Sequence, residues 1–261
     1  MPSLINKAFH YLQRRGVAET AVRIMRYPFL RIAENRFKRR ALALHTRESR
    51  YTAIYLRGSA RNKDNFSGTG STLEYTSNLR QELPKLLDRL GVKTVLDVPC
   101  GDFYWMKHLL AEVNVEYIGG DIVLPLIESH NARHKNAKTT FVHIDLTADR
   151  LPGADIMICR DCLFHLSFHD IDGFLQNFVE SGIPFLLTTT HINEGLFRNR
   201  DIVTGDFRLL DLFSSPFFFP QEVAHRIADW IEPGPKREMC LWTRKQMVEV
   251  VAARDQSIGG P

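Results

Sequence analysis

The chain has 261 residues, of which 44% are hydrophobic and 25% are charged, a composition typical of a globular protein with a sizeable core. No apolar run reaches the ~20 residues of a membrane-spanning helix, and the N-terminus lacks the charged-then-apolar order of a secretory signal. Four cysteines are too few in a chain of this length for a disulfide scaffold. We therefore expect free thiols and a cytoplasmic protein.

The charge is distributed unevenly along the chain. Residues 1–50 hold 12 Lys and Arg against 3 Asp and Glu, whereas the other 211 residues hold 22 against 27. A mildly acidic remainder argues against a domain that binds nucleic acid over its whole surface. We therefore expect no nucleic-acid partner.

Residues 1–56 are predicted to form a basic N-terminal segment of helices, because apolar residues recur there at helical spacing. The apolar positions are Leu4, Ile5, Ala8, Phe9, Leu12, Val17, Ala21, Ile24 and Met25. Pro28 is expected to break or kink this run. A basic cluster then follows, made of Arg36, Lys38, Arg39 and Arg40.

Three interpretations of the basic residues in 1–50 are open. They would serve as a peripheral contact with an anionic membrane, at its inner face, or as a contact with an anionic glycan or lipid carrier. In the third interpretation they belong to solvated helices packed on the domain. The basic residues are not confined to one face, which favours the third.

Residues 57–91 are predicted to be a loop followed by a helix. Small polar residues at 57–59 and 67–71 are typical of a loop. Residues 73–90 place a set of leucines on one helical face, with Gly91 as the stop signal. These leucines are Leu79, Leu83, Leu86, Leu87 and Leu90.

From residue 92 to residue 261 the pattern alternates between strands and helices. Strands are predicted at 94–98, 115–119, 140–144, 155–159 and 184–189, and helices at 103–112, 124–134 and 169–180. Such alternation indicates βαβ units and a mostly parallel sheet. Residues 226–232 and 238–243 flank Pro233-Gly234-Pro235 and predict a terminal antiparallel hairpin.

Polar residues follow the first three predicted strands, at the sheet edge where open α/β sheets bind ligands. Asp97-Val98-Pro99-Cys100-Gly101-Asp102 follows the first strand, and its glycine lets the backbone approach a ligand closely. Asp121 ends the second strand, 20 residues after Gly101, a spacing at which a carboxylate accepts hydrogen bonds from ribose hydroxyls. Asp145 follows the third strand and is placed to accept from an adenine amino group.

These positions resemble the motifs of class I methyltransferases that depend on S-adenosylmethionine (SAM). The resemblance implies a Rossmann-like fold with a seven-stranded sheet, and SAM as cofactor. It implies that Asp97 and Gly101 hold the methionine half of SAM, and that Asp121 holds the ribose. It also implies that Asp145 contacts adenine between Ile144 and Leu146. Further cofactor-binding candidates are Pro99, Asp102, Ile122 and Arg160, with Arg80 for the SAM carboxylate and residues 57–91 as a cofactor lid.

The loop departs from the family pattern, because Pro99 and Phe103 stand where glycines are usual. A Pro-Cys-Gly-Asp version resembles a loop of bacterial methyltransferases, in which Asp102 would bind the SAM amino group. An NAD-linked oxidoreductase is the rival interpretation, but dinucleotide binding needs glycines at those same two positions. A non-catalytic SAM-fold binding or adaptor protein is a second rival, opposed by Asp97, Gly101, Asp121 and Asp145.

Three residues are candidate general bases. Asp161 and His165 follow the fourth strand, which faces the methyl donor in the family, and His191 ends the fifth strand. Histidine suits base catalysis because its ordinary pKa is near neutrality. Each histidine has an alternative role: His165 would only pack against SAM at a helix start, and His191 would only shape the pocket.

Residues 199–211 form a long polar stretch that is predicted to recognise the acceptor. Its aspartates (Asp201, Asp206 and Asp211) would also be able to hold a divalent cation, although a solvated loop is the simpler interpretation. Zinc is not expected, because Cys159 and Cys162 lack a second pair. His165 and His169 likewise lack the intervening Glu of zinc proteases.

Together these features predict a SAM-dependent methyltransferase. The acceptor is expected to be a hydroxyl of a sugar, glycan or other small molecule, because no Asn-Pro-Pro-Tyr sequence of amino-group methyltransferases follows the fourth strand. The closest resemblance is to bacterial methyltransferases that act on glycans or secondary metabolites.

Overall fold

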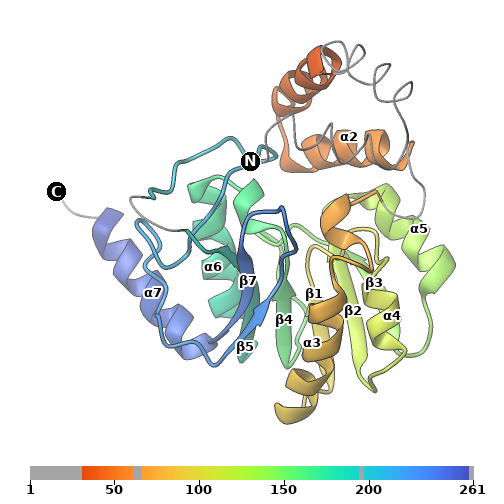
Figure 1. The fold of residues 1–261 in the computed structure, drawn as a ribbon, viewed down its shortest axis with the longest axis vertical. Helices are drawn as coiled ribbons and strands as arrows, with labels where there is room; N and C mark the ends of the chain where they lie inside the picture. The colour runs from red at the N-terminus through yellow and green to blue at the C-terminus, as the bar shows by residue number, and fades with distance from the viewer. Residues whose placement is uncertain (1–30, 61–65, 194–196, 259–261) are drawn as a thin grey trace.

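The computed structural model describes residues 31–60, 66–193 and 197–258. The predicted helical pattern between Leu4 and Met25, and the break at Pro28, lie outside these residues. The strands of the described part are β1 (Thr94–Asp97), β2 (Glu116–Asp121), β3 (Thr139–His143), β4 (Ile156–Cys159), β5 (Phe185–His191), β6 (His225–Ala228) and β7 (Arg237–Thr243). They form one seven-stranded sheet in the order β3-β2-β1-β4-β5-β7-β6 (Figure 1).

The sheet confirms the predicted fold class. β1 to β5 are parallel to their neighbours, whereas β7 runs antiparallel between β5 and β6. The chain therefore returns to the sheet as a hairpin whose second strand is inserted beside β5. Because all five parallel strands run the same way, their carboxyl ends meet along one edge of the sheet.

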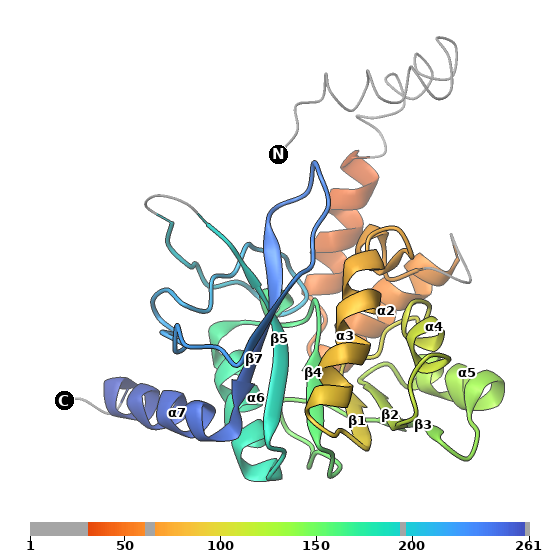
Figure 2. The same cartoon turned by 60° about the horizontal axis from the view of Figure 1, so that its bottom comes forward.

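Helices cover both faces of the sheet, so the parallel strands are buried on both sides. The helices are α3 (Ser77–Arg89), α4 (Met106–Leu110), α5 (Leu124–His134), α6 (Phe168–Ser181) and α7 (Arg244–Ile258). Neighbouring residues of β1 face opposite layers: Val95 packs with α3 and α4, and Leu96 packs with α6 and α7. Strand alternation thus splits the core into two apolar layers (Figure 2).

Two helix predictions need correction. The helix predicted over 103–112 is only Met106–Leu110, because Phe103 has a left-handed backbone (φ 57°) that delays the helix start. The α7 helix was not predicted. Its Met247 and Val250 are buried, but they follow β7 directly and leave too short an apolar pattern to be recognised.

The N-terminal segment contributes one further helix stretch, at residues 31–42, and then α2 (Arg47–Ser59). Thr46 caps α2 through a reciprocal pair of bonds with Ser49, which fixes where the helix begins. The loop prediction at 57–59 is therefore wrong, since these residues form the last turn of α2. The predicted segment boundary at residue 56 falls inside this helix.

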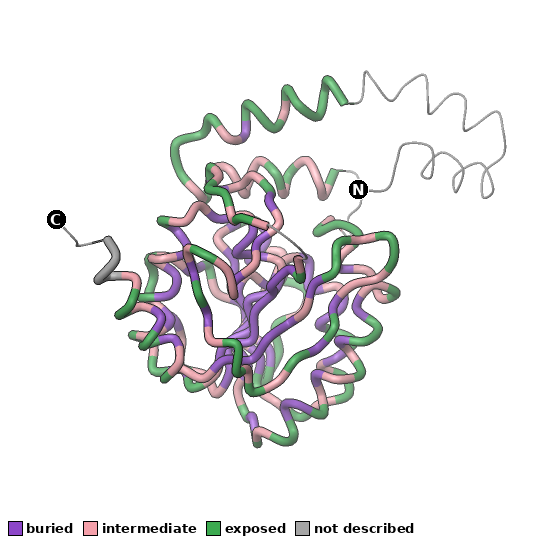
Figure 3. The backbone as a smooth tube through the Cα atoms, turned by 60° about the vertical axis from the view of Figure 1, so that its left-hand side comes forward, coloured by how far each residue is buried: buried purple, intermediate pink, exposed green. Residues whose placement is uncertain are grey.

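The basic cluster lies on the exposed stretch 31–42, which projects from the α/β body (Figure 3). Arg36, Lys38, Arg39 and Arg40 are all exposed, and Lys38 forms an ion pair with Asp206. Within the described ranges, no helix is both long and apolar enough to cross a membrane.

Candidate active site

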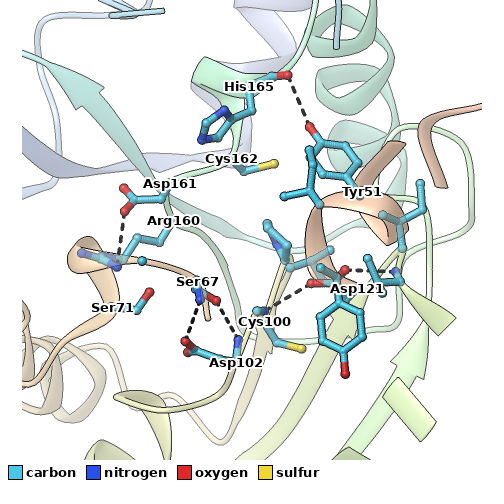
Figure 4. A pocket seen from close by; sticks show the side chains of 18 of the residues that line it. Tyr51, Ser67, Ser71, Cys100, Asp102, Asp121, Arg160, Asp161, Cys162 and His165 are labelled. Carbon is cyan, nitrogen blue, oxygen red and sulfur yellow. Dashed lines mark hydrogen bonds and ion pairs between the residues drawn. The ribbon is translucent and has the colours of Figure 1, made fainter. Parts of the chain in front are cut away.

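A cavity of about 480 Å³ opens along the carboxyl ends of the parallel strands, within the size range of small-molecule sites. Five parts of the chain line it: α2, the loop at 66–71, the turns after β1 to β4, Phe207 of the loop after β5, and the start of β7 (Figure 4). Among the predicted site residues, the cavity is lined by Asp97, Pro99, Gly101, Asp102, Asp121, Ile122, Asp145, Leu146, Arg160, Asp161 and His165. The turns of separate strands therefore meet in one space.

Gly101 sits where no other residue fits without adjustment. Its φ is +54°, in the left-handed region that favours glycine. A Cβ built on it would lie 2.9 Å from Ser67 Oγ. Its amide donates a hydrogen bond to Asp121 Oδ2 at 3.2 Å, so the turns after β1 and β2 are tied together.

Two buried carboxylates face the cavity from β1 and β2. Asp97 accepts a hydrogen bond from the Tyr117 hydroxyl at 2.7 Å, and Asp121 also accepts one from the Val123 amide at 3.0 Å. Burial raises the pKa of Asp97 to about 7 and the pKa of Asp121 to about 6. Neither forms an ion pair with a described residue, so both would be stabilised by a cationic ligand.

Phe103 explains how the loop dispenses with a glycine. It adopts a left-handed backbone itself, a conformation that is costly for a bulky side chain. Its ring is buried and packs against Tyr117, Phe141 and His134, with centroid distances of 5.3, 5.0 and 5.3 Å. This aromatic packing holds the backbone in a shape that glycine would adopt without side-chain contacts.

Asp102 is bound to the loop at 66–71 by reciprocal hydrogen bonds. The Ser67 amide donates to the Asp102 carboxylate at 3.0 Å, and the Asp102 amide donates to Ser67 Oγ at 3.0 Å (Figure 4). The Tyr104 amide donates to the same carboxylate at 3.1 Å. Its predicted role toward the SAM amino group stays a prediction.

The adenine pocket expected from the sequence is only partly correct. Asp145 and Leu146 line the cavity, but Ile144 does not, because it packs in the core against Gly120 and Val98. Its strand alternates faces, so Ile144 points away from the site. The apolar lining at this end comes instead from Ile122, Val123 and Leu126.

Arg160 and Arg80 both differ from expectation in what they bind. Arg160 lines the cavity but pairs with buried Asp229 through Nε at 2.9 Å and Nη2 at 3.0 Å, and its Nη2 donates to the Gly70 carbonyl at 2.8 Å. It thus holds the loop at 66–71 against β4. Arg80 does not line the cavity and instead donates to the Leu73 carbonyl, so the structure does not bring it to the other residues predicted to bind SAM.

Asp161 and His165 lie at the far end of the cavity, after β4. Asp161 has a left-handed backbone (φ 55°), and its Oδ2 lies 2.9 Å from Arg237 Nη2. His165 Nδ1 lies 2.7 Å from the Asp206 carbonyl oxygen. A carbonyl only accepts, so Nδ1 carries the hydrogen and Nε2 of the neutral ring has a free lone pair. Burial lowers the pKa of His165, which keeps the ring neutral at pH 7.

His191 does not lie on the cavity wall, contrary to expectation. It is 2% exposed and packs against Phe164, and its Nδ1 accepts a hydrogen bond from the Leu210 amide at 3.2 Å. Burial lowers the pKa of His191 to about 4. The side chain therefore lies behind Phe164, the arrangement expected if His191 only shapes the pocket.

The aspartates of residues 199–211 are each bound to a different part of the protein, Asp206 to Lys38. Asp201 accepts the Phe168 amide at 2.7 Å and Asp211 accepts the Phe213 amide at 2.9 Å. They do not converge, and the described residues contain no group of three or more metal-ligating side chains. Phe207 from this loop lines the cavity, is 42% exposed, and packs beside the His165 ring. Part of the loop therefore lies at the cavity, although its role in recognising the acceptor stays a prediction.

Sequence reasoning missed the α2 residues and Arg237. Arg47, Tyr51, Ile54 and Tyr55 all line the cavity, at the spacing of one helical face. The helical spacing of these four residues can be recognised in the sequence, but the sequence does not indicate which part of the sheet their helix covers. Arg237 reaches the site only because β7 is inserted beside β5.

Comparisons with known proteins agree on the fold. No protein-family model and no curated protein sequence matches the chain. A SAM-dependent methyltransferase from Leishmania major superposes with a TM-score of 0.57 at 13% identity, covering 78% of this chain and 89% of that one. The 1,6-didemethyltoxoflavin-N1-methyltransferase of Burkholderia thailandensis gives 0.52 at 15% identity, covering 74% and 86%. Magnesium protoporphyrin IX methyltransferase from Synechocystis gives 0.51 at 12% identity, covering 76% and 98%.

The chain has the fold of SAM-dependent methyltransferases. At these identities the likeness concerns the fold alone, and the chemistry must be argued from the site. The antiparallel β7 inserted beside β5 agrees with this fold and differs from the all-parallel continuation of dinucleotide-binding sheets.

Proposed function

We propose that the protein is a SAM-dependent methyltransferase that methylates a hydroxyl group of a sugar, glycan or other small molecule. One observation carries the proposal: Asp97, Asp121 and Asp145 from three adjacent strands line the same cavity as His165. A cofactor-binding edge and a neutral histidine thus share one enclosed space. Bound SAM would supply the activated methyl group.

The residues present fit SAM in charge and in shape. Asp97 and Asp121 are buried carboxylates whose raised pKa values favour a cationic ligand such as a sulfonium with its amino group. Asp121 would accept from the ribose hydroxyls, and Ile122 and Leu146 would contact adenine. A Cβ at Gly101 would meet Ser67 Oγ, so glycine lets the turn after β1 pack closely against the loop at 66–71. The loop at 66–71 would act as the cofactor lid.

His165 is the proposed general base. Its Nε2 lone pair is free for a proton because Nδ1–H is bound to the Asp206 carbonyl. Removing the acceptor proton raises the nucleophilicity of the hydroxyl oxygen, and the cavity orients that oxygen toward the methyl group. Phe207 offers an exposed ring at the same end, against which the apolar face of an acceptor would pack.

The proposal is tested by titration followed by an acceptor screen. S-adenosylhomocysteine (SAH) and NADH are titrated into the full chain by calorimetry, and SAH release is then measured with sugars and phenols as acceptors. Binding of SAH and turnover with a hydroxyl acceptor are expected. Binding of NADH alone would establish the oxidoreductase alternative, and SAH binding without turnover by any hydroxyl acceptor would favour the non-catalytic alternative.

A further inference from the structure

A single face of α2 forms the wall of the cavity opposite the strand ends. Arg47, Tyr51, Ile54 and Tyr55 line the cavity, and two hydrogen bonds anchor the helix to the segments that contain His165 and Thr204. The Tyr51 hydroxyl donates to the His165 carbonyl at 3.3 Å (Figure 4), and Arg50 donates to the Thr204 carbonyl at 3.3 Å. The position of Arg47 is therefore fixed by bonds made one turn further along the helix.

Arg47 bridges two carboxylates that come from distant parts of the chain. Its Nε donates to Asp145 Oδ2 at 2.9 Å, and its Nη1 donates to Asp170 Oδ1 at 2.8 Å. Asp145 follows β3, whereas Asp170 is buried in the first turn of α6. The planar guanidinium offers donors in a fixed fork, which a lysine does not, so it sets the separation and orientation of both carboxylates.

The hydrogen-bond inventory of Asp145 shows what this bridge achieves. Oδ1 accepts twice, from the Thr147 amide at 3.0 Å and from the Thr147 hydroxyl at 2.7 Å. Oδ2 accepts once, from Arg47. Each carboxylate oxygen accepts about two hydrogen bonds, so the remaining capacity lies on Oδ2. The direction of that lone pair is set by the side on which Arg47 already binds.

We propose that Arg47 is a positioning residue for the cofactor, which orients Asp145 Oδ2 to accept the exocyclic amino group of adenine. The inference rests on the proposed function. It makes α2, from the basic N-terminal segment, a part of the cofactor site. Arg47 would thereby help the site to distinguish adenine from other nucleobases. It would do so through Asp145, because the guanidinium itself stays bound to the two carboxylates.

The test compares SAH with S-inosylhomocysteine, in which a carbonyl oxygen replaces the exocyclic amino group. A carboxylate accepts from an amino group and repels a carbonyl oxygen, so the full chain is expected to prefer SAH by roughly 10- to 100-fold. In Arg47→Ala this preference is expected to fall to about 3-fold or less, because Asp145 Oδ2 is no longer held. Arg47→Lys is expected to give an intermediate preference.

The matched control is Arg57→Ala, which removes the other arginine of α2 that forms an ion pair. Arg57 pairs with Glu34 and does not line the cavity, so the control is expected to keep the full preference. If Arg47→Ala fails to fold in a thermal melt, Arg47→Lys and Asp170→Asn provide the same comparison. In an Asp145→Asn background, Arg47→Lys is expected to cause no further change in the preference.

Three outcomes would overturn the inference. Arg47→Ala would weaken both ligands equally if Arg47 only stabilised α2, and it would strengthen SAH binding if Arg47 competed with adenine for Asp145. A third contradiction is loss of preference in Arg57→Ala as well. If the unmodified chain binds neither ligand, the proposed function itself fails, which distinguishes that failure from a failure of the role of Arg47.

Discussion

The two ends of the cavity are built in different ways. At the proposed adenosine end, Asp121 is the last residue of β2 and Asp145 follows β3, and each accepts a hydrogen bond from the amide two residues further along. At the proposed acceptor end, Asp161 is paired with Arg237 from β7, and His165 is bound to Asp206 from the loop after β5. Local turns supply the amide contacts of the first end, to which Arg47 of α2 adds a distant contact on Asp145, whereas contacts between distant segments organise the second end.

This difference indicates how far the geometry of each end of the cavity depends on distant parts of the chain. A local turn positions Asp121 where its strand ends, so this carboxylate is expected to tolerate change in remote loops, whereas Asp145 also depends on Arg47 of α2. The acceptor end depends on three segments arriving together, so its geometry and its acceptor preference are free to change through residues 199–211 and β7.

Replacing the proposed base is expected to have the largest effect. His165→Ala should lower kcat for methyl transfer by about 10²- to 10⁴-fold while SAH affinity is unchanged, because the two ends act separately. Burial lowers the pKa of His165, so the wild-type rate should stay level through neutrality and fall only below the usual histidine range. Kinetics with an acceptor found by the screen measure both.

The control for that variant is His169→Ala, an exposed neighbour that does not line this cavity. Loss of SAH affinity in His165→Ala would contradict the separation of the two ends.

Asp97, which is proposed to hold the methionine half of SAM, is tested through its effect on stability. Its folded pKa is about 7 against an ordinary 3.8, because burial disfavours the charged form. The folded state therefore binds the proton more tightly, so the contribution of Asp97 to stability is fully present below pH 4 and is lost as the pH rises through 7. Asp97→Asn should remove a penalty of at most about 4 kcal/mol at pH 8. Thermal melts from pH 4 to pH 8 should show a smaller decline in the variant.

Some decline should persist in Asp97→Asn, since the pKa of Asp121 is also raised, to about 6. An unchanged decline would show that Asp97 is ionised at no cost in the fold.

Asp121→Ala is expected to weaken SAH binding by roughly 10- to 100-fold, since hydrogen bonds to a charged group contribute about 1.5–3 kcal/mol. The change also removes the acceptor for the Gly101 and Val123 amides. Calorimetry measures the affinity, with Asp88→Ala on the exposed face of α3 as control. Equal affinities in the two variants would contradict the assignment of the ribose to Asp121.

The smallest effect is expected from Gly101→Ala, with a loss of about 1–2 kcal/mol in stability. The new Cβ would occupy a left-handed backbone and approach Ser67 Oγ, which a rotation of Ser67 relieves in part. Denaturant unfolding of Gly101→Ala alone and with Ser67→Gly measures both contributions. A stabilised Gly101→Ala would show that the φ value is wrong.

The sequence predicted that Asp97, Asp121 and Asp145 meet at one edge of the sheet, and the three line one cavity. This was predictable because a parallel strand and its turn are local features with a fixed spacing, whereas the contacts of these residues with SAM stay predictions. Ile144 was misassigned by one step of the strand alternation. His191, Arg80 and Arg47 were missed or misplaced because their surroundings depend on Phe164, Leu73 and Asp170, which lie far away in the sequence or in another turn.

The structure also explains why Phe103 stands where methyltransferases usually have a glycine. Phe103 takes the left-handed backbone, and the Tyr117, Phe141 and His134 rings surround it. Those partners come from β2, β3 and α5, so no local pattern announced that an aromatic residue would replace glycine there.

A crystal structure of the full chain with SAH bound tests the central claim most directly. We expect the ribose hydroxyls on Asp121, the adenine edge beside Asp145, and the sulfur directed toward the end that holds His165. SAH bound outside this cavity, or bound in the reverse direction with its adenine at His165, would contradict it.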